Sequence, residues 1–135
     1  MRVELTSVLV DNQEKALRFY TDILGFEKKT DIPAGKFRWL TVISPEQDRC
    51  VELLLEPNEN SAAKTFQAAI FDQGIPFTAF AVDDIQHEYD RLTKLGVTFP
   101  TKPTSSPNRP TIAMFDDTCG NLIQIYQAPK TSAAE

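Results

Sequence analysis

The chain repeats one pattern of residues, and this repeat strongly limits the folds available to it. Residues 9–26 read LVDNQEKALRFYTDILGF, and residues 81–97 read AVDDIQHEYDRLTKLGV. In each copy an apolar stretch is followed by acidic or amide residues, then by apolar residues at helical spacing, and then by a glycine. The repeat predicts that the chain is built from two copies of one structural unit.

Each copy begins with a strand and continues as a helix. Residues 4–10 and 77–82 are short, apolar and rich in Val, Phe and Thr, which is typical of strands. Asn12 and Asp84 follow them and can accept the free N–H groups of a first helical turn. Gly25 and Gly96 can end the helices in a left-handed conformation. The apolar helix faces are Ala16, Tyr20, Ile23 and Leu24 in the first copy, and Ile85, Tyr89, Leu92 and Leu95 in the second.

The remaining segments complete two βαβββ modules. Residues 36–44 and 49–57 are expected strands of the first module, and residues 109–117 and 121–127 of the second, joined by a turn at Gly120. Residues 61–73 are an expected linking helix, and the proline-rich residues 100–110 an exposed loop or lid. We expect one domain, 1–128, with modules 1–57 and 75–128, and a disordered tail, 129–135.

Composition excludes several classes of protein. The 135 residues are 41% hydrophobic and 24% charged, and no apolar run approaches the roughly 20 residues that span a bilayer. The N-terminus has no signal-peptide pattern, and a net charge of -5 argues against a nucleic-acid partner. Cys50 and Cys119 are too few for a disulfide framework. We therefore expect reduced thiols in a cytoplasmic protein, although one bridge between them is possible.

Three stretches resemble motifs of the vicinal oxygen chelate superfamily, which includes glyoxalase I, extradiol dioxygenases, and bleomycin and fosfomycin resistance proteins. They are VDNQEKALRFYTDILGF, FAVDDIQHEYDRLTKLGV and FDDTCGNLIQIYQ. The resemblance implies an α+β fold in which two paired βαβββ modules form a cup-shaped mixed sheet with helices outside. It also implies a homodimer with its site in the cup.

The resemblance places the metal ligands of such proteins at four positions, which are here Leu5, Glu52, Phe77 and Gln124. An offset of 72 residues carries the first two positions onto the last two. Leu5 and Phe77 have no lone pair to offer, and a transition-metal site needs three or more imidazole, thiolate or carboxylate donors. His87 is the only histidine, and its place on the second helix turns it to solvent. We expect no metal and no cofactor.

Alternation along strands predicts which side chains line the cup. The expected ligand-binding residues combine apolar and aromatic groups with few polar ones. The phase of the strand that carries Trp39 is left open. For any one of the aromatic residues, packing in the core is an equally good explanation. Glu52 can act as a proton acceptor or donor, or instead pair with Arg38 or Arg49 or face solvent. Cys119 lies beside acidic residues that disfavour a thiolate. The expected set is Leu5, Ser7, Trp39, Glu52, Leu54, Phe77, Gln124 and Tyr126.

Two functions fit these residues. The first is a metal-free homodimer that sequesters an aromatic or cationic small molecule in an apolar cup. The alternative is a metal-independent lyase or isomerase, with Glu52 as general acid or base and Gln124 or Ser7 stabilising an oxyanion. Metal-dependent glyoxalase or dioxygenase activity ranks third because it needs the metal. The sequence leaves open the ligand, any turnover, and whether the modules pair within a chain or across a dimer.

Overall fold

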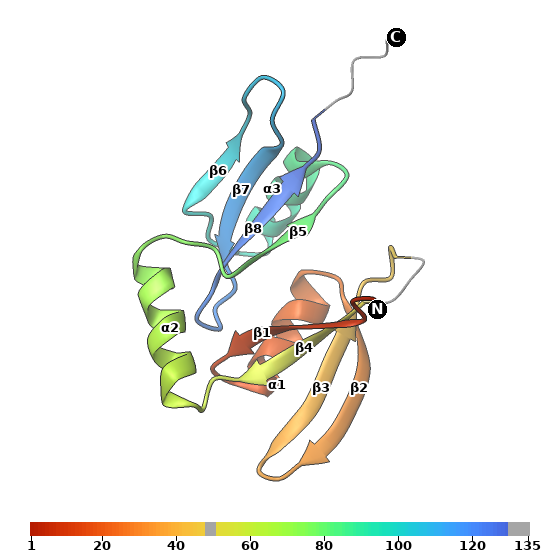
Figure 1. Ribbon diagram of the computed structural model, residues 1–135. Coiled ribbons are helices and arrows are strands. Elements are labelled where there is room, and N and C mark those ends of the chain that lie inside the picture. The colour runs from red at the N-terminus through yellow and green to blue at the C-terminus, as the bar shows by residue number, and fades with distance from the viewer. Residues whose placement is uncertain (48–50, 130–135) are drawn as a thin grey trace.

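Figure 1 shows the computed structural model of the chain, which describes residues 1–47 and 51–129. The first half forms a four-stranded sheet in the order β1-β4-β3-β2, with β1 parallel to β4 and the other neighbours antiparallel. Its elements are β1 (Leu5–Val10), α1 (Gln13–Arg18), the π-helical segment η1 (Phe19–Ile23), β2 (Glu27–Ala34), β3 (Phe37–Ile43) and β4 (Glu52–Pro57).

The second half repeats this arrangement in a separate sheet of order β5-β8-β7-β6. Its elements are β5 (Thr78–Ala81), α3 (Ile85–Lys94), β6 (Thr101–Thr104), β7 (Thr111–Asp116) and β8 (Leu122–Gln127). The linking helix α2 (Ser61–Asp72) runs along one side, next to the ends of both sheets (Figure 1). The predicted α+β fold of two βαβββ modules is confirmed. No helix in the described part of the chain combines the length and apolar character that a membrane crossing requires.

Local signals set the helix boundaries. The side chain of Asn12 accepts the backbone N–H of Lys15 at 2.9 Å, and that of Asp84 accepts the N–H of His87 at 3.0 Å. Gly25 has φ +92°, a conformation that side chains with a Cβ adopt only with strain. One feature was not predicted: the first helix widens after Arg18 into η1, where the N–H of Leu24 reaches the carbonyl of Phe19.

The prediction of a loop over residues 100–110 is partly wrong, because β6 lies within it. This strand is at the edge of its sheet, and it pairs with β7 only at Thr101 and Thr104, with an irregularity between them. Pro103 falls in that gap, where the missing N–H removes no ladder hydrogen bond. Residues 105–110 are exposed, as expected. Cys50, Arg49 and residues 130–135 of the predicted tail lie outside the described residues.

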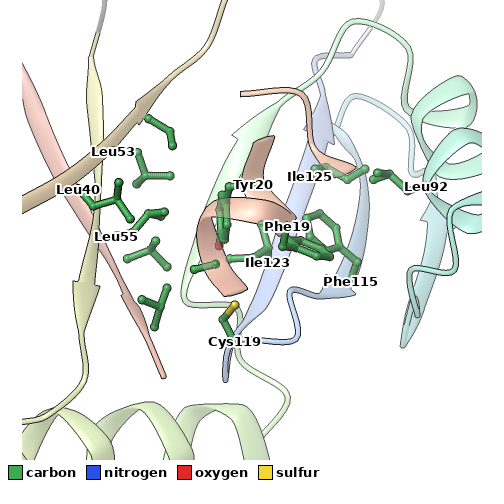
Figure 2. Packing of buried hydrophobic residues seen from close by; sticks show 14 of the residues in the cluster. Phe19, Tyr20, Leu40, Leu53, Leu55, Leu92, Phe115, Cys119, Ile123 and Ile125 are labelled. Carbon is green, nitrogen blue, oxygen red and sulfur yellow. The ribbon is translucent and has the colours of Figure 1, made fainter. Parts of the chain in front are cut away.

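The core is shared by the two modules, with α1 and η1 between the sheets. Figure 2 shows Leu40, Leu53 and Leu55 on one side of the helix that carries Phe19 and Tyr20. Phe115, Ile123 and Ile125 of the second sheet lie on its other side (Figure 2). Adjacent residues Phe19 and Tyr20 are both buried, since this helix has a sheet on each side. Burying a large apolar side chain stabilises the fold by about 1.5–3 kcal/mol, so this junction contributes strongly.

The buried side-chain amide of Gln67, on α2, forms hydrogen bonds to both modules at one end of the molecule. The Nε2 group of Gln67 donates to the carbonyl of Leu9 and to Oδ1 of Asn121, each at 3.0 Å. Asn58 donates to its Oε1 at 2.8 Å. These contacts join β1, the end of β4 and the β7–β8 turn, and they fix the relative position of the two sheets.

Candidate functional site

Each sheet uses one face for the shared core and turns the other face outward. In β1, Val8 and Val10 are fully buried in the core, so Leu5 and Ser7 lie on the outward face. Leu5, the first residue of the edge strand β1, is 43% exposed. The register places Leu5 opposite Glu52 and Ser7 opposite Leu54. Four predicted site residues therefore lie together on the outward face of the first sheet.

Trp39 belongs to the same outward face. Its neighbour Leu40 is fully buried in the core, as is Val42, so Trp39 and Thr41 point to the opposite side. Trp39 is 44% exposed and lies across from Ile32, which is 55% exposed. This gives the strand phase that the sequence left open, and it is the one favoured there.

Hydroxyl groups on two neighbouring strands hold the carboxylate of Glu52. The Oγ1 atom of Thr41 donates to Glu52 Oε1 at 2.7 Å, and that of Thr30 donates to the same oxygen at 3.3 Å. The alternative ion pair with Arg38 does not form. That guanidinium instead binds both oxygens of Asp31, at 2.9 and 2.7 Å, and Glu14 at 2.9 Å. The other alternative, Arg49, lies outside the described residues.

The second sheet differs from the first by a shift of register. Gln124 and Tyr126 lie on its outward face, opposite Ala79 and Ala81. Phe77 lies two residues before Ala79, and its N–H donates to the carbonyl of Leu122 at 2.8 Å. A shift of two residues relative to the first sheet keeps every side chain on its face, so Phe77, Gln124 and Tyr126 lie on the same face of the second sheet.

Phe77 is also covered from within the chain. Its ring packs edge-on against Phe66 of α2, with 6.1 Å between the ring centroids, and it is only partly buried. The helix that was predicted only as a linker thus shields one end of the second sheet's outward face. Phe77 has a packing role, and whether it also touches a ligand stays a prediction.

The structure does not bring the two groups of predicted residues onto one sheet within the chain. Leu5, Ser7, Trp39, Glu52 and Leu54 lie on the first sheet, and Phe77, Gln124 and Tyr126 on the second. The shared core occupies the space between the sheets, because their helix-facing sides pack on α1 and η1. The outward faces are therefore separate surfaces of a single copy.

A cleft of about 690 Å³ lies at the module junction and was missed by sequence reasoning. Phe26 and Phe80 are on its wall, with 5.4 Å between their ring centroids, and Arg91 crosses it to donate to the carbonyl of Ile23 at 2.9 Å. Tyr126 is the only member of the predicted set along it, among the described residues. Residues of both modules line this cleft, so no local pattern of the sequence predicts it.

The residues at the four ligand positions do not fit a divalent metal. Glu52 supplies one carboxylate, Gln124 a neutral amide, and Leu5 and Phe77 nothing. Ala79, which faces Gln124 in the observed register, has no donor either. Within residues 1–47 and 51–129, no three His, Cys, Asp or Glu side chains gather as a metal cluster would require.

Two further residues considered from the sequence lie away from these faces. His87 is exposed on α3, as predicted. Cys119 is buried in the β7–β8 turn, and burial raises the pKa of its thiol to about 12. A thiol of this kind is almost entirely protonated near neutral pH, so it is a poor nucleophile. Cys119 is a packing residue.

Comparison with known proteins agrees with this architecture. A family model described as Glyoxalase/Bleomycin resistance protein/Dioxygenase superfamily matches residues 2–125. YurT of Bacillus subtilis (strain 168) is 58% identical over 127 residues, which cover 94% of this chain and 99% of that protein.

Solved structures share the fold over nearly their whole length. UcmS2 has a TM-score of 0.79 and 30% identity, covering 93% of this chain and 97% of the other. TnmS3, described as an antibiotic binding protein from Streptomyces sp. CB03234, has a TM-score of 0.71 and 28% identity, covering 96% and 97%. The chain belongs to the glyoxalase/bleomycin resistance protein/dioxygenase superfamily.

Proposed function

We propose that this protein binds a small aromatic or cationic molecule without a metal, on the outward faces of its sheets. The supporting observation is the first sheet's outward face, where Leu5, Trp39 and Ile32 are 43%, 44% and 55% exposed. A concave, mostly apolar surface with a few fixed polar groups is the usual character of a small-molecule site. Trp39 offers a face on which a planar or cationic group can stack.

We further propose that the binding cup is completed by a second copy. The two outward faces point away from the shared core, so one copy cannot enclose a ligand between them. β1 and β5 are both edge strands of their sheets, with one side open to another strand. Placing β1 of one copy beside β5 of another joins two four-stranded sheets into one cup and covers the exposed apolar groups. A homodimer with two such cups follows.

The relatives support the binding part of this proposal. TnmS3 is described as an antibiotic binding protein and shares 28% identity and nearly the full length with this chain. Within one superfamily the scaffold serves both catalysis and binding, so the residues at the site decide between them. Here the metal-ligand positions hold mostly hydrocarbon or amide groups, which favours enclosure of a ligand over metal chemistry.

Light scattering after size exclusion and thermal denaturation with ligands test the proposal together. We expect a dimer, and a melting temperature that rises with bleomycin or with the planar cation proflavine, since a ligand of the folded state stabilises it. Trp39→Ala should lower the shift, while Leu95→Ala, which removes a leucine 49% exposed at the end of α3, should not. A monomer with no shift across a broad set of aromatic compounds would contradict the proposal.

The fixed carboxylate of Glu52 supports a second candidate, a metal-independent lyase or isomerase. The two threonine hydroxyls orient Glu52 on the outward face of the first sheet, as a general base must be oriented toward its substrate. For any compound that the protein turns over, Glu52→Gln should abolish turnover and leave the melting temperature nearly unchanged. Full activity of this variant would exclude Glu52 as the base.

A further inference from the structure

Glu52 has one carboxylate oxygen committed to the protein and a fixed orientation. Both hydroxyl donors, Thr41 at 2.7 Å and Thr30 at 3.3 Å, approach Oε1. Thr41 is itself fully buried, so its hydroxyl cannot exchange this partner for bulk water without a structural change. Two donors on one oxygen leave the accepting capacity of Oε2 for another group.

The surroundings make that second oxygen selective. Across the sheet, Leu5 lies directly opposite Glu52, and the next row is Ser7, Leu54, Thr41 and Thr30, by the register of the four strands. Among the described residues, no lysine or arginine forms an ion pair with Glu52. A half-buried carboxylate beside hydrocarbon gains from a donor, above all a cationic one, and disfavours another anion.

We infer that Glu52 is the polar anchor of the cup and that it selects ligands bearing a hydrogen-bond donor, above all a protonated amine, over anionic ligands of the same shape. The inference rests on the proposed function and specifies the chemistry of its ligand. The apolar part of the ligand contacts Leu5, which is 43% exposed, and its donor reaches Oε2 of Glu52. Thr41 acts as a positioning residue because it holds the carboxylate in this orientation.

A matched series of naphthalene compounds tests the inference by calorimetry. Naphthylmethylamine, naphthylmethanol, methylnaphthalene and naphthoic acid share one ring system and differ in the polar group. We expect the amine to bind about tenfold or more tightly than methylnaphthalene, with the alcohol between them, and naphthoic acid to bind weakest. Glu52→Gln should remove the preference for the amine and leave the affinity for methylnaphthalene unchanged.

Further variants separate anchoring from general effects of charge. Glu27→Gln removes one negative charge from an exposed position at the start of β2 and should keep the amine preference. Thr41→Val should reduce the preference severalfold, and Thr41→Ser, which keeps the hydroxyl, should restore it. The melting temperature of each variant establishes that it is folded, and the Thr41 pair tests the anchor if Glu52→Gln fails to fold.

The outcomes distinguish this inference from the proposed function. If the wild-type protein binds all four compounds equally, or if Glu52→Gln keeps the amine preference, the anchor is wrong while the binding function stands. If the wild-type protein binds none of the four, both are overturned. Tighter binding of naphthoic acid than of the amine would show that the cup selects anions and would overturn the inference alone.

Discussion

The hydroxyl of Tyr20 donates a hydrogen bond of 2.7 Å to Oδ2 of Asp117, joining the helix of the first module to the β7–β8 turn of the second. Both side chains are fully buried. Asp117 also accepts from the side chain of Asn121 at 2.8 Å and from the backbone N–H groups of Cys119 and Asn121, at 2.8 and 3.0 Å. Since 97 residues separate Tyr20 from Asp117, this contact forms only when the two modules dock.

Tyr20→Phe removes the hydroxyl and keeps the ring. We expect the free energy of unfolding to fall by about 1.5–3 kcal/mol, the range for a buried hydrogen bond to a charged acceptor. Urea denaturation measures this change, with the m-value unchanged if the unfolded state is unaffected. The matched control is Tyr89→Phe, which removes the same atom from a half-buried tyrosine whose ring packs on Phe99. If both variants lost the same free energy of unfolding, the Tyr20–Asp117 hydrogen bond would contribute no more than an ordinary tyrosine hydroxyl.

Asp117 should make stability depend on pH. Burial raises the pKa of this carboxyl above its ordinary value of 3.8, and this outweighs the four hydrogen bonds that lower it. The folded chain then binds the proton more tightly than the unfolded chain. The group's contribution to stability is therefore greatest below pH 3.8 and decreases as pH rises through the raised pKa.

The destabilisation caused by Asp117→Asn isolates this effect from the other carboxylates. Urea denaturation of the wild type and the variant at about pH 4 and about pH 7 gives the penalty at each pH. We expect a smaller penalty at the higher pH. A penalty that grows with pH would mean that the hydrogen bonds, and not burial, decide the pKa of Asp117.

Gly120 should not accept a side chain. It has φ +100°, and a Cβ atom there would lie 2.8 Å from Nε2 of Gln67, whose hydrogen bonds hold both modules. Gly120→Ala is expected to lower the free energy of unfolding by about 1–3 kcal/mol through backbone strain and displacement of Gln67. The control is Gly35→Ala, where φ is +63° and no heavy atom lies within 4 Å of the new Cβ. Melting temperatures compare the two, and a larger loss at Gly35 would refute the steric argument.

The thiol of Cys119 should react slowly with alkylating reagents in the folded protein. Its burial and its raised pKa, about 12, leave little accessible thiolate near neutral pH. In a Cys50→Ser background, we expect a maleimide to label Cys119 slowly without denaturant and rapidly in urea. Mass spectrometry measures both rates. Rapid labelling of the folded chain would require the β7–β8 turn to open readily.

Most of the secondary structure follows from local signals in the sequence. Asn12 and Asp84 cap their helices and Gly25 has a positive φ, as predicted, because caps and glycine conformations depend on nearby backbone alone. Alternation predicted that Gln124 lies on the face opposite to Ile123 and Ile125, because a strand turns successive side chains to opposite sides. The single domain, the cytoplasmic location and the ligand-binding roles stay predictions.

The features that the sequence did not predict depend on contacts between distant segments. Gln124 lies opposite Ala79, a register that forms between two strands more than 40 residues apart. Phe77 meets Phe66 because α2 lies next to the end of the second sheet. The partners of Glu52 are Thr30 and Thr41, and not Arg38, because Arg38 lies on the opposite face of β3 from Thr41 and pairs there with Asp31.

The sequence by itself determined two βαβββ modules, since the repeat, the helix caps and the strand alternation are encoded locally. Tertiary structure alone decided that α1 and η1 lie between the sheets and that the two groups of predicted site residues face away from each other. The physical reason is that docking of the modules depends on how apolar faces from distant segments fit together, and on a few buried hydrogen bonds such as Tyr20–Asp117. No short stretch of the chain encodes that fit.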